Sequence, residues 1–132
     1  MQRFVQKITV TAEHIDGLMH VNNVQYLYWV QEIAKAHWQA LTQTRADIQG
    51  VWVVRTHTID YKKPAFQGDP LRIETHIQSL RGPLSQRQVC FYHDQSNVLI
   101  ARCTTQWCYM DPHTRKPLSA PAFMGDFCLN AN

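Results

Sequence analysis

The sequence predicts an α+β domain in which a curled antiparallel sheet of about five strands wraps one long helix. One uninterrupted helical segment near the N-terminus precedes four β-like segments. The short connections between those segments favour antiparallel pairing. A helix of about eighteen residues (~27 Å) also matches strands of about ten residues (~33 Å), so the sheet can follow the whole helix. At 132 residues we expect a single domain, 1–132.

The N-terminal third predicts one strand and the long helix. Residues 3–11 alternate apolar and polar side chains, as strands do, and residues 12–22 are irregular. Residues 23–41 contain no glycine or proline and predict a helix capped by Asn22 or Asn23. Apolar residues recur there at helical spacing: Leu27, Val30, Ala34, Trp38 and Leu41. Most other positions are also apolar, so we expect a helix enclosed by the curled sheet or by a second subunit.

The remainder predicts a sheet and a short terminal helix. Residues rich in β-branched and aromatic side chains, or alternating in polarity, form four segments: 51–62, 71–80, 86–93 and 98–109. The polar residues 94–97 form a hairpin-like connection between the last two segments. Residues 120–128 predict one short helix.

Composition and charge exclude several classes of protein. The net charge is +3, from thirteen basic and ten acidic residues without segregation, which gives no argument for nucleic acid or membrane binding. No stretch approaches the roughly twenty apolar residues of a membrane span, and no secretory core follows the N-terminus, so we expect a cytoplasmic protein. The cysteines form no CxxC pair and are interpreted as buried apolar residues: Cys90, Cys103, Cys108 and Cys128.

A polar cluster lies directly before the long helix, and it is the strongest candidate for chemistry. Its members are Glu13, His14, Asp16, His20, Asn22 and Asn23. Free backbone N–H groups and the helix dipole would stabilise an oxyanion at this helix end. A carboxylate such as Asp16 could attack a carbonyl or activate water there, which outlines acyl transfer or hydrolysis. The alternatives are a plain helix cap, or a metal site of His14, Asp16 and His20, whose spacing matches no metal motif.

Four segments resemble one family. Residues 16–26 (DGLMHVNNVQY) resemble the active-site segment of hotdog-fold acyl-CoA thioesterases of the 4-hydroxybenzoyl-CoA thioesterase group, and their HVNNxxY core is also similar to that of plant acyl-ACP thioesterases. Residues 32–35, 61–71 and 111–117 resemble later parts of the family pattern, in order along the chain. This chain departs from the pattern at three positions: Met19 replaces a usual Gly, Leu18 replaces the Asn of the plant-type enzymes, and Lys35 replaces Arg.

The resemblance implies the hotdog fold and hydrolysis of an acyl-CoA thioester to a carboxylic acid and free CoA. It implies Asp16 as the catalytic carboxylate, either as nucleophile or as general base for water. Backbone amides near Asn23 and Val24 would polarise the thioester carbonyl, and His20 with Asn22 or Asn23 would orient the loop or the substrate. The reaction requires no metal or organic cofactor. The family assembles as homodimers or homotetramers with active sites between subunits.

Four further residues are candidates for substrate binding. Arg81 and Arg87 flank the turn between two predicted strands and could hold the phosphates of CoA at a pocket mouth, or be solvated turn residues. Tyr26 and Trp29 of the helix could line the acyl pocket, or pack in the core. Other functions stay open: a non-catalytic acyl-CoA-binding protein, a thioesterase acting on acyl carrier protein, or a structural subunit bound to a partner. The hydratases of the same fold have a different pattern.

Overall fold

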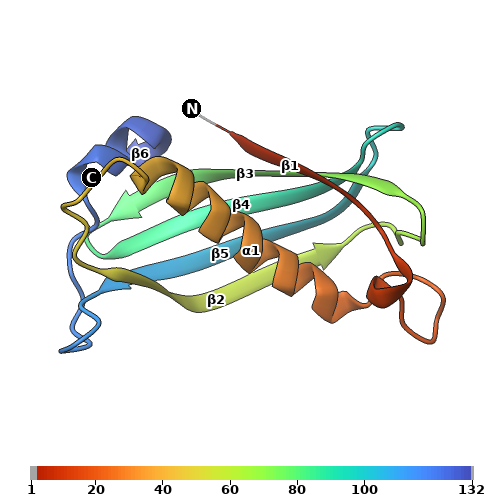
Figure 1. The fold of residues 1–132 in the computed structure, drawn as a ribbon, viewed down its shortest axis with the longest axis horizontal. Helices are drawn as coiled ribbons and strands as arrows, with labels where there is room; N and C mark the ends of the chain where they lie inside the picture. Colours follow the sequence, from red (N-terminus) through yellow and green to blue (C-terminus); the bar gives the residue numbers. More distant parts are fainter. Residues whose placement is uncertain (1–2, 132) are drawn as a thin grey trace.

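The computed structural model describes residues 3–131 as one sheet with one long helix lying across a face of it (Figure 1). The elements in chain order are β1 (Phe4–Thr9), the 3-10 helix η1 (Ala12–His14), α1 (Asn23–Thr42), β2 (Val51–Tyr61), β3 (Pro70–Arg81), β4 (Leu84–His93), β5 (Leu99–Met110), the 3-10 helix η2 (Ala122–Phe127) and β6 (Cys128–Ala131). The ends of α1 and of β1 to β5 agree with the sequence prediction to within two residues.

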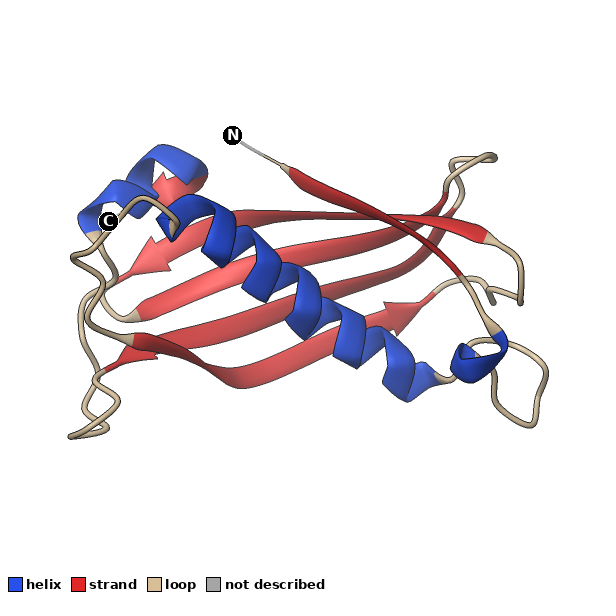
Figure 2. Cartoon of the chain, viewed as in Figure 1, coloured by secondary structure: helices blue, strands red, loops and turns tan. Residues whose placement is uncertain are grey.

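The sheet is antiparallel except at one short strand. Its order is β1-β3-β4-β5-β2, and each neighbouring pair is antiparallel. The prediction of a single terminal helix over 120–128 was incomplete, because η2 is followed by β6, which pairs in parallel with β3. The helical and strand parts of this C-terminal segment lie beside the end of α1 (Figure 2). Four residues of strand are too few for a polarity alternation to be seen in the sequence.

The buried face of α1 differs from the predicted stripe. Its buried residues are Tyr26, Trp29, Val30, Ile33, Ala34 and His37. Leu27, Trp38 and Leu41 of the predicted stripe are only half-buried. On the outer face Val24 is 69% exposed and Tyr28 is 59% exposed, so the sheet of one protomer does not enclose the helix. The predicted stripe was therefore right for Val30 and Ala34 only, because apolar residues surround most of the helix and periodicity alone does not single out its core face.

The core between α1 and the sheet has two parts. The larger lies under the first half of α1, where Val30 and Ile33 pack against Ile73, Val89 and Phe91. A smaller cluster of Ile77, Leu80 and Met124 lies under the second half, with Trp38 and Trp52 against it. Cys90, Cys103 and Cys108 are buried as expected, and Cys128 is half-buried. No helix within residues 3–131 has the length and apolar character to span a membrane.

Candidate active site

The loop between η1 and α1 is a tight turn built around Asp16. An isolated bridge between Ile15 and Val21 closes its base. Inside the turn the backbone N–H of Asp16 donates to the His20 carbonyl at 3.1 Å. The Leu18 N–H donates to Oδ1 of Asp16 at 2.8 Å. Asp16 is a half-buried residue, and its carboxylate is held in place by its own turn. Oδ2 makes no hydrogen bond within residues 3–131.

Met19 explains a departure from the family pattern. Its φ is +69°, in the left-handed region where glycine has no steric cost. The usual glycine before His20 thus corresponds to a backbone requirement of this turn. Gly17 is not in that region, and a Cβ there would meet no atom within 4 Å. The strain of the loop is concentrated at the methionine.

The first turn of α1 offers one free amide. Asn22 is the N-cap, and its Oδ1 accepts from the Val24 N–H at 2.9 Å. The Gln25 N–H donates to the Asn22 carbonyl at 2.9 Å. The expectation that the Val24 amide is free to polarise a carbonyl was therefore wrong, because the cap occupies it. The Asn23 N–H has no hydrogen-bond partner among the residues described, so it is the available donor.

A small cavity of about 150 Å³ opens beside this helix end. Its lining residues are His20, Val21, Asn23, Tyr26, Tyr61, Lys62, Lys63 and Pro64. Nδ1 of His20 lies 3.3 Å from the Val21 carbonyl. The Tyr61 hydroxyl donates to the Asn23 carbonyl at 3.1 Å and ties the end of β2 to the helix start. Burial raises the pKa of Tyr26 to about 12, so its phenol is neutral. Asp16 does not line this cavity.

Sequence reasoning missed the role of the segment 61–64 in this cavity. It lies about forty residues downstream of the loop in sequence, and the fold brings it back along β2. Lys62 and Lys63 are exposed at the cavity and form the longest basic run in the chain. The family-like YxxP pattern of residues 61–64 was a signal that could have placed them there.

The other predicted binding residues lie elsewhere. Arg81 is exposed at the end of β3, at the opposite end of the sheet from the Asp16 loop (Figure 1). Arg87 is 5% exposed and lies inside the protomer, so the expectation that it flanks a turn at a pocket mouth was wrong. Four residues into β4, its side chain points toward α1. Trp29 is a core residue that contacts Tyr26 and Phe91.

No group of three His, Cys, Asp or Glu side chains within residues 3–131 is placed to hold a metal ion. His14, one of the three candidate ligands, instead accepts the Thr11 N–H on Nδ1 at 3.0 Å. Its ring also meets the Trp29 ring edge to face, with centroids 4.9 Å apart. The loop is thus organised by backbone hydrogen bonds and aromatic packing around one carboxylate.

Comparison with known proteins places this arrangement in a family. Residues 1–123 match the acyl-ACP thioesterase N-terminal domain. The long-chain acyl-CoA thioesterase FadM of Escherichia coli K12 is 27% identical over 118 residues, covering 86% of this chain and 87% of FadM. The crystal structure of YbaW, a probable thioesterase from Escherichia coli, superposes with a TM-score of 0.76 at 26% identity, covering 87% of this chain and 88% of YbaW.

A third similar structure supports the assignment of the fold only. Slr0204, a 1,4-dihydroxy-2-naphthoyl-CoA thioesterase from Synechocystis, has a TM-score of 0.77 at 21% identity, over 91% of this chain and 90% of its own. The curled antiparallel sheet and single long helix are shared with these hotdog structures. The chain therefore belongs to the acyl-ACP thioesterase family and is a thioester hydrolase with the hotdog fold.

Proposed function

We propose that the chain hydrolyses acyl-CoA to a carboxylic acid and free CoA, with Asp16 as its catalytic carboxylate. The observation that carries the proposal is the fixed carboxylate of the half-buried residue Asp16 in the turn that leads into α1. Oδ1 is engaged by the Leu18 N–H, which leaves Oδ2 free to react. The relative FadM is named for action on long-chain acyl-CoA, which supports this substrate class.

Thioester hydrolysis with Asp16 as its catalytic carboxylate can follow either of two mechanisms. As a nucleophile, Oδ2 of Asp16 would add to the thioester carbonyl carbon, the C–S bond would break, CoA thiolate would leave, and water would cleave the resulting anhydride. As a general base, the carboxylate would take a proton from water while the hydroxide adds to the same carbon; the C–S bond of the tetrahedral intermediate would then break, CoA would leave as thiolate or take the proton, and the carboxylic acid would remain. In both, the Asn23 N–H and the positive end of the helix dipole would stabilise the oxyanion.

The neighbouring residues have supporting roles in the proposal. Asn22 caps the helix and so orients the Asn23 amide, and His20 lines the adjoining cavity where substrate would enter. Lys62 and Lys63 would attract the phosphates of CoA beside the helix start. Arg81 could contribute to that binding only from another subunit, because it lies at the far end of the sheet.

The proposal includes a homodimer or homotetramer. β2 is a sheet edge eleven residues long, and within the described chain no strand pairs with its outer side. Val51 and Val53 are exposed on this strand, as are Val24 and Tyr28 on the outer face of α1. A long unpaired edge next to exposed apolar side chains is stabilised when another subunit covers it.

An acyl carrier protein is the second candidate carrier. The matching family is defined by acyl-ACP thioesterases, and carrier proteins and CoA present the same kind of thioester. A non-catalytic acyl-CoA-binding role is the remaining alternative. It would retain affinity for CoA thioesters and release no thiol.

The test is thiol release from acyl-CoAs from acetyl to palmitoyl, with benzoyl-CoA and one acyl carrier protein thioester. Asp16→Asn keeps an oxygen for the Leu18 N–H and should lower turnover by several powers of ten, on the order of 10³ or more. Asp111→Asn is the matched control, since Oδ1 of Asp111 accepts the His113 and Thr114 amides in a turn outside the site. Near-normal turnover in Asp16→Asn would exclude its catalytic role.

A further inference from the structure

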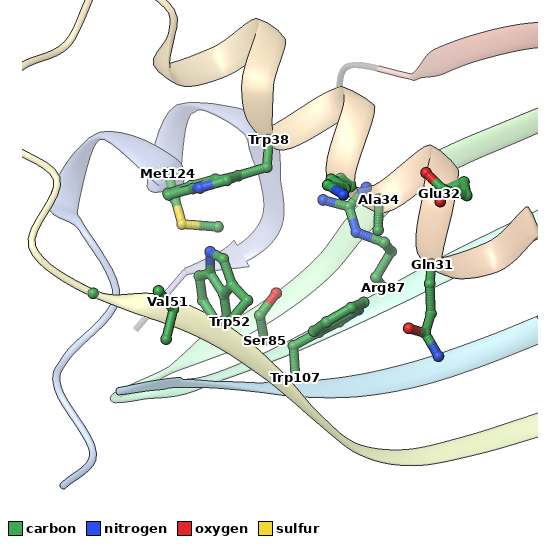
Figure 3. Close-up of a pocket in the computed structure, with 12 residues that line it drawn as sticks. Gln31, Glu32, Ala34, Trp38, Val51, Trp52, Ser85, Arg87, Trp107 and Met124 are labelled. Carbon is green, nitrogen blue, oxygen red and sulfur yellow. The ribbon is translucent and has the colours of Figure 1, made fainter. Parts of the chain in front are cut away.

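A second and larger cavity lies under the second half of α1. It encloses about 420 Å³ between the helix and the sheet, at the smaller of the two core clusters. Figure 3 shows Trp38 and Met124 on one side and Trp52, Ser85 and Trp107 on the other. Arg87 rises from β4 between them toward the helix. Three tryptophan rings therefore form much of the wall, and Arg87 lies among them.

Arg87 is a buried cation without an anionic partner. Its Nη1 donates to Nδ1 of His37 at 2.9 Å and to Oγ1 of Thr75 at 3.1 Å. Both acceptors are neutral. The Thr75 hydroxyl carries no charge, and burial together with the positive charge of Arg87 lowers the pKa of His37 to about 4. Burial also lowers the pKa of Arg87 to about 10, which leaves it protonated at neutral pH. Nε and Nη2 make no hydrogen bond within residues 3–131.

The nearest acidic side chain on the cavity wall does not neutralise Arg87. Glu32 lies at the exposed rim and forms no ion pair with Arg87 within 4 Å. Its carboxylate instead interacts with Tyr28 and raises the pKa of that phenol. Lys35, the other charged rim residue, adds a second positive charge. The cavity thus has an excess of positive charge.

The free donors beside this cavity belong to Arg87. The indole Nε1 of Trp107 also has no hydrogen-bond partner in the described part of the chain, but it is fully buried, so a molecule in the cavity cannot reach it. Nε and Nη2 of Arg87 make no hydrogen bond with the residues described, and the side chain of Arg87 lines the cavity. A buried donor without a partner costs about 1–3 kcal/mol, and a buried charge costs more. An oxygen acceptor placed beside the guanidinium would therefore reduce that cost.

We propose that this cavity recognises an acyl group bearing an oxygen acceptor remote from its thioester, a terminal carboxylate above all. The tryptophan rings would hold the carbon body, while Nε and Nη2 of Arg87 would donate to the carboxylate oxygens. The inference rests on the proposed thioesterase function and names its substrate class. A plain alkyl chain would leave Nε and Nη2 of Arg87 unpaired, and sites of this kind discriminate against such analogues.

The outer face of α1 connects the two sites. Val24, Tyr28, Gln31 and Lys35 follow one another at spacings of three and four and so share one face of the helix. Val24 and Tyr28 are exposed, and Gln31 and Lys35 line the cavity. Gln31 lies about 12 Å along the helix from Asn23. A long extended acyl group can therefore run from the helix start along this face of α1 into the cavity.

The experiment compares hexadecanedioyl-CoA with palmitoyl-CoA, which differ only in that a terminal carboxylate replaces a methyl group. The acyl chain must be long, because His37, the partner of Arg87, lies fourteen residues or about 21 Å along the helix from Asn23. We expect kcat/KM to favour hexadecanedioyl-CoA by about 100-fold or more. Arg87→Gln should abolish the preference, and Arg87→Lys, which keeps the charge but not the paired N–H groups, should reduce it about ten-fold. The controls are Trp107→Phe, which trims a ring of the wall without removing a donor that faces the cavity, and Arg102→Gln, which removes an exposed charge; both should keep the preference.

A binding measurement separates this inference from the thioesterase proposal. Three of the four tryptophans line the cavity, so intrinsic fluorescence reports its occupation. Saturable quenching by hexadecanedioyl-CoA that Arg87→Gln abolishes would support the inference even if neither substrate were hydrolysed. Hydrolysis that depends on Asp16 but shows no preference for hexadecanedioyl-CoA would overturn the inference and leave the thioesterase proposal intact.

Discussion

Acidification should destabilise the fold through His37. The ring is buried and stacks on Phe4 with centroids 5.0 Å apart, while Nδ1 accepts from Arg87 Nη1 at 2.9 Å. Protonating Nδ1 would replace this hydrogen bond by two facing donors and set two positive charges together. Burial of the ring disfavours its charged form, and the positive charge of Arg87 adds to this effect, so the pKa of His37 is lowered from 6.5 to about 4. In the unfolded chain the ring is exposed to water, and its pKa returns to the ordinary value of 6.5.

The sign and size follow from this shift. Below pH 6.5 the unfolded chain binds a proton on His37 that the folded chain does not, so stability falls as pH falls toward 4 and then levels off. The full shift corresponds to about 3 kcal/mol. Because hydration of the ring would screen part of this effect, we expect about 2 kcal/mol. The pKa values of His57 and His76 are also lowered by burial, so they act in the same direction.

Urea unfolding of the protein and of His37→Gln, at one protomer concentration and at several pH values between 7 and 4.5, isolates the effect. The glutamine Oε1 can still accept from Arg87 and does not titrate. Subtracting the two pH profiles cancels His57 and His76, and the difference should be about 2 kcal/mol smaller at pH 4.5 than at pH 7. Parallel profiles across this range would refute the reasoning.

Two substitutions, one to glycine and one from glycine, test the backbone of the loops. Met19→Gly removes a left-handed strain of about 1 kcal/mol but increases the entropy of the unfolded chain, so stability should stay equal or rise slightly. A loss of stability above ~1 kcal/mol in urea unfolding would contradict the presence of strain at Met19. Gly50→Ala would place its Cβ 2.6 Å from the ring of Tyr109 and should cost about 1–3 kcal/mol. Gly17→Ala, with open space around it, is the control and should change stability by less than about 0.5 kcal/mol.

The sequence was sufficient to predict the strands and the long helix, but not which side of the helix is buried. Strand alternation and the uninterrupted helical segment are local signals, so five strands and α1 were predicted closely. Which side of α1 is buried depends on what packs against it. Tyr26 and Ile33, outside the predicted stripe, are buried, whereas Leu41 is only half-buried. When apolar residues lie on most sides of a helix, the local sequence does not show which side packs in the core.

The candidate site was predictable only in part for a related reason. Asp16 and the cap Asn22 belong to one continuous segment, so their proximity follows from sequence. The engagement of the Val24 amide depends on the rotamer of Asn22, which sequence does not specify. Arg87 was assigned to a turn by its position between strands, but β4 begins three residues before it. Alternation then directs its side chain to the interior.

Arg87 links the acid sensitivity of the fold to the proposed recognition of substrate. A buried charge with two neutral acceptors on one nitrogen destabilises the fold, and apolar replacements of buried charged groups are often neutral or stabilising. His37 and Thr75 reduce that cost at Nη1 and fix the guanidinium, while Nε and Nη2 stay free for a ligand. His37 can do so only when neutral. The pH dependence of stability is therefore the expected consequence of keeping a cation available inside the cavity, a compromise of stability for recognition.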